Sequence, residues 1–510
     1  MLKASMNAFI SSLASSLAFS MSVDTATCPI GVPCASLAPV QLEGATVINS
    51  TATELRNQTG IGYEDGVDVC AFEMYIRHDG ANDAVRIVTW LPQGSPTPWN
   101  GRFQGTGGGG YNGGFFEASL GPATFQGFAA SSTDGGAPSG DVPELWADDT
   151  QLVLNMGYLS FHDMTIVGKA VTHQFYGRPA KYSYWTGCSM GGRQAYSEAQ
   201  KYPDDYNGIL SVSGPVGWDK VGVAVLWPYI VQNNGADGFV GLCKLDYLTE
   251  QSVAACAPLD GDKDNVIAYP PACDFTAASQ VGTTVACENG IASTVTEYDA
   301  AMWDSMRRGP RTKDGDFLWW GMEPGASLDL WAAEPRDLIS IVSAWIRDFL
   351  IKDTDYDIAD IGLDQYTSLF AEAVAEYSDT WGSDDPDLSS FKERGGKFLA
   401  WHGWADERIP GMGSVHYWEM VKRALGGLQE VDAVYRLFMA PGALHCGIHF
   451  GADPTDVNVL VDWVENGVEP ETLPPSIDRT FVKTCKHPKK AEYKGKGSLD
   501  DPDSWACVEV

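Results

Sequence analysis

The stretch that decides the fold is YSYWTGCSMGGR at residues 182–193. Its apolar and aromatic start, residues 182–186, predicts a short strand. The small residues of 187–192 predict a tight turn, and residues 193–202 predict a helix that Pro203 ends. A Gly-X-Ser-X-Gly motif between a strand and a helix is typical of a nucleophile elbow, which exposes a serine hydroxyl above an α/β sheet. Ser189 is therefore the candidate nucleophile.

A serine hydroxyl needs a base and an acid, which follow it in the order Ser, acid, His on this kind of scaffold. Asp406 follows a predicted strand at 396–401, and His445 follows another at 433–439. Loops after parallel strands meet at one edge of a sheet, so Asp406 can orient the imidazole of His445. Glu407 is the alternative acid. The alternative bases are His402 and His449.

Two cysteines flank these candidates. Cys188 precedes Ser189, and Cys446 follows His445. If the serine and the histidine are in hydrogen-bond contact, the two thiols are neighbours, and an oxidising compartment would join them in a disulfide. The alternative is a pair of buried free thiols.

A cluster of glycines at 105–114 offers donors for the oxyanion that an acyl-transfer reaction forms. Met190, the residue after the serine, supplies one backbone N–H. A glycine of the cluster supplies the second, because only glycine lets the backbone approach so closely. We expect Gly110 to do this, with Gly109 as the close alternative; an ordinary flexible loop is the other interpretation.

The rest of the chain extends this pattern into an α/β core. Residues 70–76 and 84–91 predict strands, and residues 148–175 predict helix. Residues 215–385 differ, because they hold many tryptophans, four cysteines and Gly/Asp-rich loops. We therefore predict an α/β fold whose core, residues 23–214 and 386–510, is split by an insertion at 215–385.

Composition points to a folded extracellular protein. The chain has 510 residues, of which 44% are hydrophobic, and a formal net charge of -33. Such a charge repels phosphates, so we expect no nucleic-acid partner. The chain has 11 cysteines. No pair has the CxxC spacing of a zinc or redox site, so disulfides are expected, and the odd number leaves at least one cysteine unpaired.

The N-terminus predicts secretion. Residues 1–22 combine Lys3 with an apolar, serine-rich run that resembles a signal peptide; a disordered or docking segment is the alternative. Asn49 and Asn57 begin glycosylation sequons. No later stretch is long and apolar enough to span a bilayer, so no membrane anchoring is expected.

An acidic loop in the insertion, CAPLDGDKDNVI at 256–267, places aspartates at alternate positions. Alternate carboxylates on a tight loop can converge on one Ca²⁺ ion. Pro271 stands where an EF-hand would have its closing glutamate, so the loop is not an EF-hand. The alternative is a solvated acidic turn.

Jointly, several motifs resemble the tannase and feruloyl esterase family of secreted α/β-hydrolases, which includes mono-hydroxyethyl terephthalate esterases. The resemblance runs from about Cys34 to Cys507. It rests on the motifs WNGRF at 99–103, GCSMGGRQ at 187–194, GPRT at 309–312, HGWAD at 402–406, GALHCG at 442–447 and YKG at 493–495.

The resemblance implies an α/β-hydrolase core with the insertion as a lid domain that carries specificity residues. It implies the Ser189–Asp406–His445 triad and the Cys188–Cys446 bridge. It also implies a structural Ca²⁺ held by the side chains of Asp260 and Asp264 and the carbonyls of Asp262 and Val266. Ala257 stands where the family usually has aspartate, which removes one carboxylate.

By the same resemblance, further disulfides are expected: Cys34–Cys70, Cys243–Cys256, Cys273–Cys287 and Cys485–Cys507. Cys28 is left over, with Cys28–Cys70 as an alternative pairing. The expected reaction is hydrolysis of an aromatic-acid ester, such as a feruloyl, other hydroxycinnamoyl or galloyl ester, with no organic cofactor. Aliphatic or terephthalate-type esters are the alternative substrates, and a catalytically silent binding protein is the alternative class.

Overall fold

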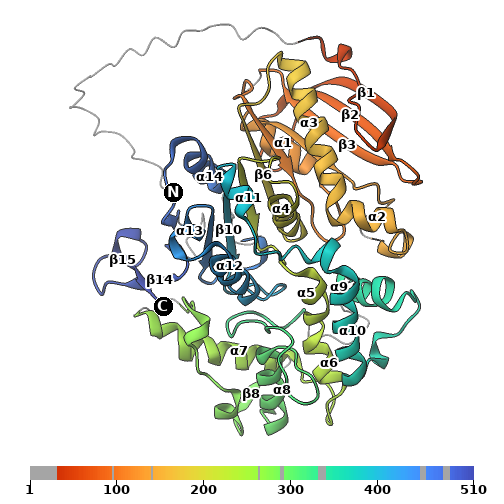
Figure 1. Cartoon of the computed structure of the whole chain (residues 1–510). Helices are drawn as coiled ribbons and strands as arrows, with labels where there is room; N and C mark the ends of the chain where they lie inside the picture. Colours follow the sequence, from red (N-terminus) through yellow and green to blue (C-terminus); the bar gives the residue numbers. More distant parts are fainter. Residues whose placement is uncertain are drawn as a thin grey trace, which may run out of the picture.

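One mixed sheet organises the computed structural model, with nine strands among the described residues in the order β1-β2-β3-β5-β4-β6-β7-β10-β11 (Figure 1). The pairs from β1 to β5 are antiparallel, and the pairs from β5 to β11 are parallel. The predicted α/β class is confirmed. The strands are β1 (Ala45–Gln58), β2 (Val67–His78), β3 (Val85–Pro92), β4 (Arg102–Thr106), β5 (Ala129–Thr133), β6 (Tyr182–Cys188), β7 (Gly208–Val212), β10 (Lys397–Gly403) and β11 (Tyr435–Ala440).

The structure describes residues 32–94, 97–138, 140, 142–261, 265–287, 292–330, 340–447, 455–474 and 483–510. Several sequence predictions lie outside these residues. They are the signal segment 1–22, Cys28, His449, and Asp262 and Asp264 of the predicted calcium loop.

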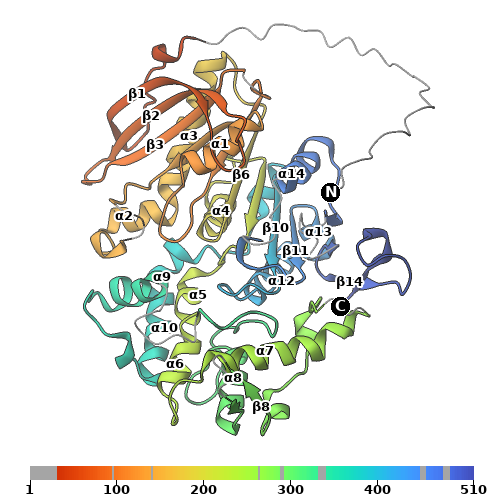
Figure 2. The ribbon, with the colours of Figure 1, turned by 180° about the vertical axis from the view of Figure 1, so that it is seen from behind.

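Helices cover both faces of the sheet (Figures 1 and 2). Helices α3, α4 and α12 pack on one face, and α1 and α14 pack on the other. The period of two in β10 shows why: Phe398 and Ala400 join the first apolar cluster, whereas Leu399 and Trp401 join the second. The core helices are α1 (Glu117–Phe125), α2 (Thr150–Leu154), α3 (Ser160–Tyr176), α4 (Met190–Lys201), α11 (Ser389–Glu393), α12 (Met412–Leu425), α13 (Leu428–Asp432) and α14 (Thr455–Asn466).

The elements expected from the sequence appear with small shifts. Strands β2 and β6 contain the predicted strands at 70–76 and 182–186, and β3 is shifted by one residue from the predicted strand at 84–91. The predicted helix at 193–202 begins earlier, at Met190, because Ser189 already turns the chain with a φ of 57°. It ends at Lys201, just before Pro203.

Between β7 and β10 the chain leaves the sheet and builds a second body, which contains the predicted insertion. Figures 1 and 2 place its helices together at one end of the molecule. Its apolar cluster, in which Trp345 and Trp381 are fully buried, also takes in Tyr111 and Trp146 of the α/β core. Its elements are α5 (Trp218–Ala224), α6 (Trp227–Asn233), α7 (Leu242–Cys256), α8 (Glu297–Arg308), α9 (Ser340–Ala344), α10 (Leu363–Tyr377) and the hairpin of β8 (Thr284–Ala286) and β9 (Ala292–Thr294).

The chain ends in two short antiparallel pairs beside β11. They are β12 (Thr472–Leu473) with β13 (Thr484–Cys485), and β14 (Lys489–Tyr493) with β15 (Trp505–Glu509). The disulfide Cys485–Cys507 joins the two pairs, as expected. The expected disulfide Cys34–Cys70 is also present.

The expected pairings of the other two disulfides in the insertion were wrong. The structure joins Cys243 to Cys287 and Cys256 to Cys273, not Cys243 to Cys256 and Cys273 to Cys287. The reason is α7, which runs from Leu242 to Cys256. Its two cysteines are separated by about 20 Å along the axis at the helical rise of about 1.5 Å per residue. A disulfide needs Cα atoms about 4.4–6.8 Å apart, so these two cannot pair.

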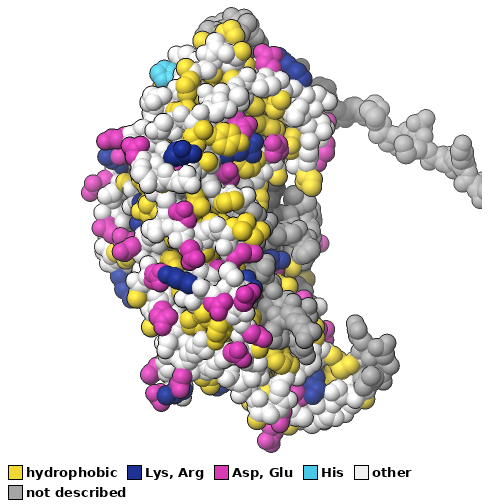
Figure 3. All heavy atoms as spheres, turned by 90° about the vertical axis from the view of Figure 1, so that its right-hand side faces the viewer, with side chains coloured by type: hydrophobic (Ala, Val, Ile, Leu, Met, Phe, Trp, Pro, Cys, Tyr) yellow, Lys and Arg dark blue, Asp and Glu magenta, His cyan; other side chains and the backbone are white. Residues whose placement is uncertain are grey.

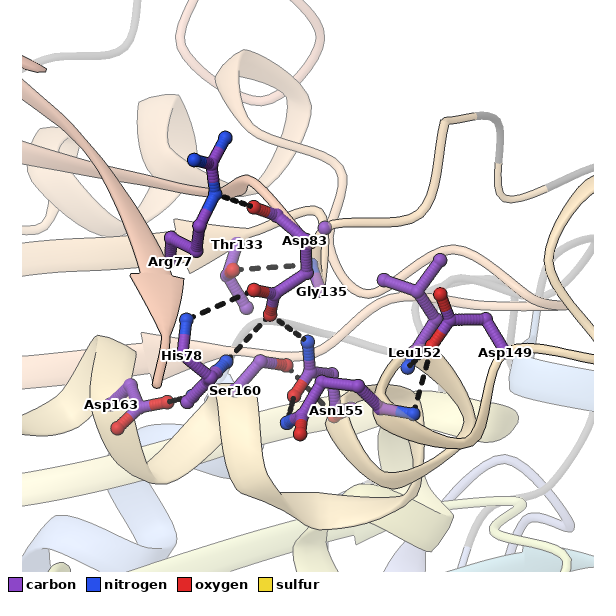
Figure 4. Close-up of polar contacts among 12 residues, drawn as sticks. Arg77, His78, Asp83, Thr133, Gly135, Asp149, Leu152, Asn155, Ser160 and Asp163 are labelled. Atoms are coloured by element: carbon purple, nitrogen blue, oxygen red, sulfur yellow. Dashed lines mark hydrogen bonds and ion pairs between the residues drawn. The ribbon is translucent and has the colours of Figure 1, made fainter. Parts of the chain in front are cut away.

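A buried polar cluster fixes the end of β2 to α3 (Figure 4). His78 lies between two carboxylates, with Nδ1 2.6 Å from Asp83 and Nε2 3.0 Å from Asp163. Asn155 donates to the same Asp83 oxygen at 2.8 Å. Burial alone would lower the pKa of His78, but the bonds to Asp163 and Asp83 outweigh it and raise this pKa to about 9. The two carboxyl groups therefore favour the imidazolium form of His78.

The surface carries the acidity of the composition. Figure 3 shows Asp and Glu side chains spread over the face in view, with Lys and Arg between them. Among the helices of the described residues, none has the length and hydropathy that a membrane crossing requires.

Candidate active site

The turn after β6 holds Ser189 in a strained conformation. Its φ of 57° and ψ of -125° lie outside the regions that a non-glycine residue normally adopts. Two bonds hold it there: Ser189 N donates to Val212 O at 2.9 Å, and Arg193 N donates to Ser189 O at 3.0 Å. A side chain at Gly187 would meet Gly191 O at 2.4 Å, so the turn requires glycine. This is the geometry of a nucleophile elbow.

The glycine cluster lies against this elbow. Gly191 N donates to Gly108 O at 3.0 Å, and the Gln194 side chain accepts from Gly108 N at 3.1 Å. A Cβ on Gly107 would lie 2.6 Å from Gly191 Cα, so glycine is needed for the close approach. Sequence reasoning missed the role of Gln194.

The predicted oxyanion donors lie at the same cavity. Gly109, Gly110 and Met190 all line it. Their backbone N–H groups have no acceptor among the described residues. Gly110 has a φ of 58°, which accounts for glycine at this position. All three positions thus combine an N–H group without an acceptor in the described chain with a place in the cavity wall.

Asp406 and His445 come together as the chain order predicts. His445 Nδ1 lies 2.9 Å from Asp406 Oδ2 and 3.1 Å from Oδ1. Asp406 Oδ1 also accepts from the backbone N–H groups of Arg408 and Ile409, both at 2.9 Å. Burial alone would raise the pKa of Asp406, but His445 and His402 outweigh it and hold this pKa far below its usual range. The carboxylate is thus anionic and fixed in orientation.

The alternative residues have other positions. Glu407 accepts from the backbone N–H of His445 at 3.1 Å and pairs with Arg408, so it holds the histidine loop rather than the imidazole. His402 is 1% exposed, has its Nε2 3.1 Å from Asp406 Oδ2 and does not line the cavity. His449, the other alternative base, lies outside the described residues.

The disulfide Cys188–Cys446 is present and joins the elbow to the histidine loop. A ring nitrogen of His445 lies within 4.8 Å of both sulfurs. Because the two cysteines are bonded to each other, these three side chains do not form a metal site. A further contact was not foreseen: Cys446 N donates to Ser213 Oγ at 3.2 Å, just after β7. No sequence pattern singles out Ser213.

Ser189 and His445 face one cavity of about 690 Å³. Apolar residues prevail among the described residues that line it, and the ionisable side chains there are those of His445 and Arg408. The second body contributes Trp218, Val225, Ile341 and Val342, and helix α1 contributes Ala118, Pro122 and Ala123. Most other tryptophans of the second body are buried in its own core, so they do not bear on ligand choice.

The proposed calcium loop is described only in part. Gly261 and Asn265, which flank its undescribed residues, both have left-handed φ values, of 90° and 62°. The disulfide Cys256–Cys273 closes the loop. Val266 lies against Gly442, three residues before His445, because a Cβ at Gly442 would be 3.0 Å from a Val266 methyl group. The loop therefore touches the histidine loop of the candidate site.

The chain is similar to known proteins over most of its length. The family model described as "Tannase and feruloyl esterase" matches residues 77–508. A probable feruloyl esterase of Arthroderma benhamiae is 37% identical, with 93% of each chain covered. Feruloyl esterase B of Aspergillus niger is 30% identical, with 90% of each chain covered.

Solved structures give the same picture. Tannin acyl hydrolase from Aspergillus niger superposes with a TM-score of 0.82 and 26% identity, over 93% of this chain and 94% of that one. Feruloyl esterase B from Aspergillus oryzae superposes with a TM-score of 0.79 and 25% identity, over 92% of this chain and 98% of that one.

Proposed function

The chain belongs to the tannase and feruloyl esterase family of carboxylic ester hydrolases, and on that premise we propose that Ser189, His445 and Asp406 are its catalytic triad. One observation carries the proposal. A serine on a strained elbow and a histidine bonded to a buried aspartate face the same cavity.

The geometry supports a two-step mechanism. Because Nδ1 of His445 is bonded to Asp406, the opposite ring nitrogen, Nε2, is left to take the proton of Ser189. Ser189 Oγ attacks the ester carbonyl, and His445 returns the proton to the leaving alcohol, which leaves an acyl-enzyme. Water then loses a proton to His445, attacks the acyl carbonyl and releases the acid. Asp406 stabilises the imidazolium that forms in each step.

Backbone donors stabilise the charge on the tetrahedral intermediate. We assign this role to the N–H of Met190 together with that of Gly110, with Gly109 as the alternative. Oriented donors in a site with little water are each worth about 3 kcal/mol of barrier, so two of them account for a large part of the rate enhancement.

The substrate is proposed to be an ester of an aromatic acid, in the feruloyl, hydroxycinnamoyl or galloyl class. The apolar lining of the cavity suits a planar ring, and a volume of about 690 Å³ has room for both the acid and an alcohol. The relatives named above point to the same class. Terephthalate-type or aliphatic esters are the second candidate, since the same apolar lining would accept them.

The test is a paired variant experiment on a panel of methyl ferulate, methyl caffeate, methyl gallate and an aliphatic methyl ester. Ser189→Ala removes the nucleophile, and we expect kcat to fall at least about 1,000-fold on the preferred ester. Ser390→Ala, at an exposed serine on α11, is the control and keeps full activity. Activity of Ser189→Ala within tenfold of the parent would refute the triad. A preference for the aliphatic ester would refute the substrate class.

We further propose a structural Ca²⁺ in the insertion, held by the side chains of Asp260 and Asp264 and the carbonyls of Asp262 and Val266. Two features support it. The donors are all oxygen atoms, which Ca²⁺ prefers, and the flanking left-handed residues Gly261 and Asn265 fold the loop tightly. Ala257 supplies no carboxylate, so we expect weaker binding than a site with aspartate there would give.

Secretion is proposed on the same footing. Five disulfides among the described residues favour an oxidising compartment. Asn49 and Asn57, which begin the two sequons, are both exposed on β1, so both are accessible to glycosylation.

A further inference from the structure

A second histidine contacts the carboxylate of the proposed triad. His402, at the end of β10, has its Nε2 3.1 Å from Asp406 Oδ2. Two imidazoles therefore share Asp406 Oδ2, because His445 Nδ1 lies 2.9 Å from the same oxygen. His402 is 1% exposed and away from the cavity, so it reaches the reaction only through Asp406.

The surroundings of His402 define its protons. Nε2 also lies 3.1 Å from Ile409 O, so both of its neighbours are acceptors and Nε2 must carry a hydrogen. Nδ1 lies 2.8 Å from Ser414 Oγ, which can either donate or accept. The site therefore accommodates both the neutral ring and the imidazolium without a change of geometry.

A carboxyl group from the second body lies near this histidine, because a Cβ at Gly411 would be 3.4 Å from both Glu323 Oε1 and the carbonyl oxygen of Gly403, the residue after His402. Glu323 is 4% exposed, and its Oε1 accepts from Met412 N at 2.8 Å, at the start of α12. Its Oε2 has no hydrogen-bond partner among the described residues. Arg307, the other charged group against it, bonds to the Glu323 carbonyl rather than to its carboxyl group.

The charges of the two groups depend on each other. Burial alone would lower the pKa of His402, but the bond and charge of Asp406, with Glu323 behind it, outweigh burial and raise this pKa. Burial raises the pKa of Glu323 to about 7, and His402 opposes that rise. The anionic form of Glu323 and the cationic form of His402 thus favour each other.

We propose that His402 is a positioning residue that holds Asp406 and lowers the proton affinity of His445 through the shared carboxylate, and that Glu323 sets the charge on His402. The proposal rests on the proposed triad. It gives the second body a part in the chemistry, because Glu323 belongs to it while Asp406 and His445 belong to the core.

The direction follows from electrostatics. The positive charge of His402 partly offsets the negative charge of Asp406. The carboxylate then stabilises the imidazolium of His445 less strongly. Loss of that cation makes His445 more basic. The acid limb of kcat/KM reports the ionisation of the base in the free enzyme, so its midpoint moves to higher pH.

The first test is His402→Gln, whose side-chain amide can keep the hydrogen bond to Asp406 but carries no charge. We expect the acid-limb midpoint to rise by about 0.5 to 1 pH unit with KM within threefold of the parent. His402→Leu removes the hydrogen bond as well, and we expect a further tenfold fall in kcat. The control is His162→Gln on α3, since His162 also pairs with an aspartate, Asp205, at 2.6 Å but lies away from the cavity.

The second test is Glu323→Gln, which keeps an acceptor for Met412 N. We expect a smaller rise of the same midpoint, because His402 loses the charge that favours its imidazolium. In the double variant, we expect the acid-limb midpoint to equal that of His402→Gln alone, because Glu323 acts only through the charge on His402. If His402→Gln fails to fold, as judged by circular dichroism, Glu323→Gln carries the test alone.

The outcomes separate this inference from the proposed function. Undiminished hydrolysis by Ser189→Ala would remove the triad and the inference with it. If Ser189→Ala is inactive but the midpoint in folded His402→Gln or Glu323→Gln stays within 0.2 pH unit of the parent, or falls, the triad stands and the role of His402 is overturned.

Discussion

Cys188 and Cys446 place a covalent bond one residue away from both the proposed nucleophile and the proposed base. An unusual backbone conformation lies at each end of the bond: Ser189, next to Cys188, has a φ of 57°, and Cys446 itself has a φ of 59°. Such conformations persist only where the surroundings enforce them. The bond is one of the constraints that hold the two loops in register.

Loss of this bond is therefore expected to lower activity as well as stability. For Cys188→Ser with Cys446→Ser we expect kcat/KM to fall at least tenfold, measured on the preferred ester. We also expect the unfolding free energy to fall by up to about 5 kcal/mol, because the loop it closes is long. The control is Cys485→Ser with Cys507→Ser, which removes a disulfide far from the cavity and leaves kcat unchanged. Mass spectrometry that found Cys188 and Cys446 as free thiols in fully active protein would contradict the prediction.

Single residues also show the reach of sequence reasoning. Ser189, Asp406 and His445 could be predicted because a strand, a loop and the chain order constrain them together. Gln194, Ser213 and the contact of His402 with Asp406 could not, because each depends on which segments the fold brings side by side. A glutamate such as Glu323 has no sequence signal at all, since its partners lie 79 and 89 positions away on another body.

Among the elements, β2 and α3 are joined by the charged cluster around His78 (Figure 4). Its pKa of about 9 lies above the ordinary value of 6.5. The stabilisation from this histidine is therefore fully present below pH 6.5 and is lost as pH rises through about 9. Asp83 contributes to stability at the acid end of the pH range. Because its pKa is lowered, this contribution to the unfolding free energy is lost only in acid, below the ordinary range of an aspartate.

This linkage gives a pH-dependent expectation. His78→Gln should lower the melting temperature most at pH 5 to 6.5, and its difference from the parent should close towards pH 10. The rise of the His78 pKa from 6.5 to about 9 corresponds to a loss of unfolding free energy of about 3 kcal/mol at most. Thermal unfolding at several pH values measures it, with His173→Gln, an exposed histidine of α3, as the control. A difference that did not vary with pH would show that the two ion pairs add nothing.

Elements of the core were more predictable than those of the insertion. The β and α periods identified β2, β3, β6, β10 and β11 because each strand is bounded by clear turn residues. The disulfides of the insertion were paired wrongly because α7 was not recognised, and only its length shows that Cys243 and Cys256 are at opposite ends.

At the scale of the whole molecule, the second body touches the core near the proposed triad at several places, among them Glu323 against Met412, Ile341 against Gly110 and Val266 against Gly442. The contact of Val266 with Gly442 comes from the proposed calcium loop. A metal bound there would stabilise the folded state by about 2.7 kcal/mol when its concentration is 100 times Kd.

We therefore expect about one calcium per chain after exhaustive dialysis, by elemental analysis. Chelator should lower the melting temperature, and added Ca²⁺ should restore it. Asp264→Asn should abolish this response, whereas Asp314→Asn, at an exposed aspartate elsewhere in the insertion, should retain it. Dialysed protein with no calcium and no response to chelator would remove the site.

The Cys188–Cys446 bond spans 258 positions of the chain, so it closes a covalent ring that contains the whole second body. A single protease cut in any loop between these residues opens the ring but separates nothing. The clipped protein runs as one band on a non-reducing gel, and its fragments part only when reductant is added. The body that faces the substrate thus keeps its attachment to the core even when its own backbone is broken.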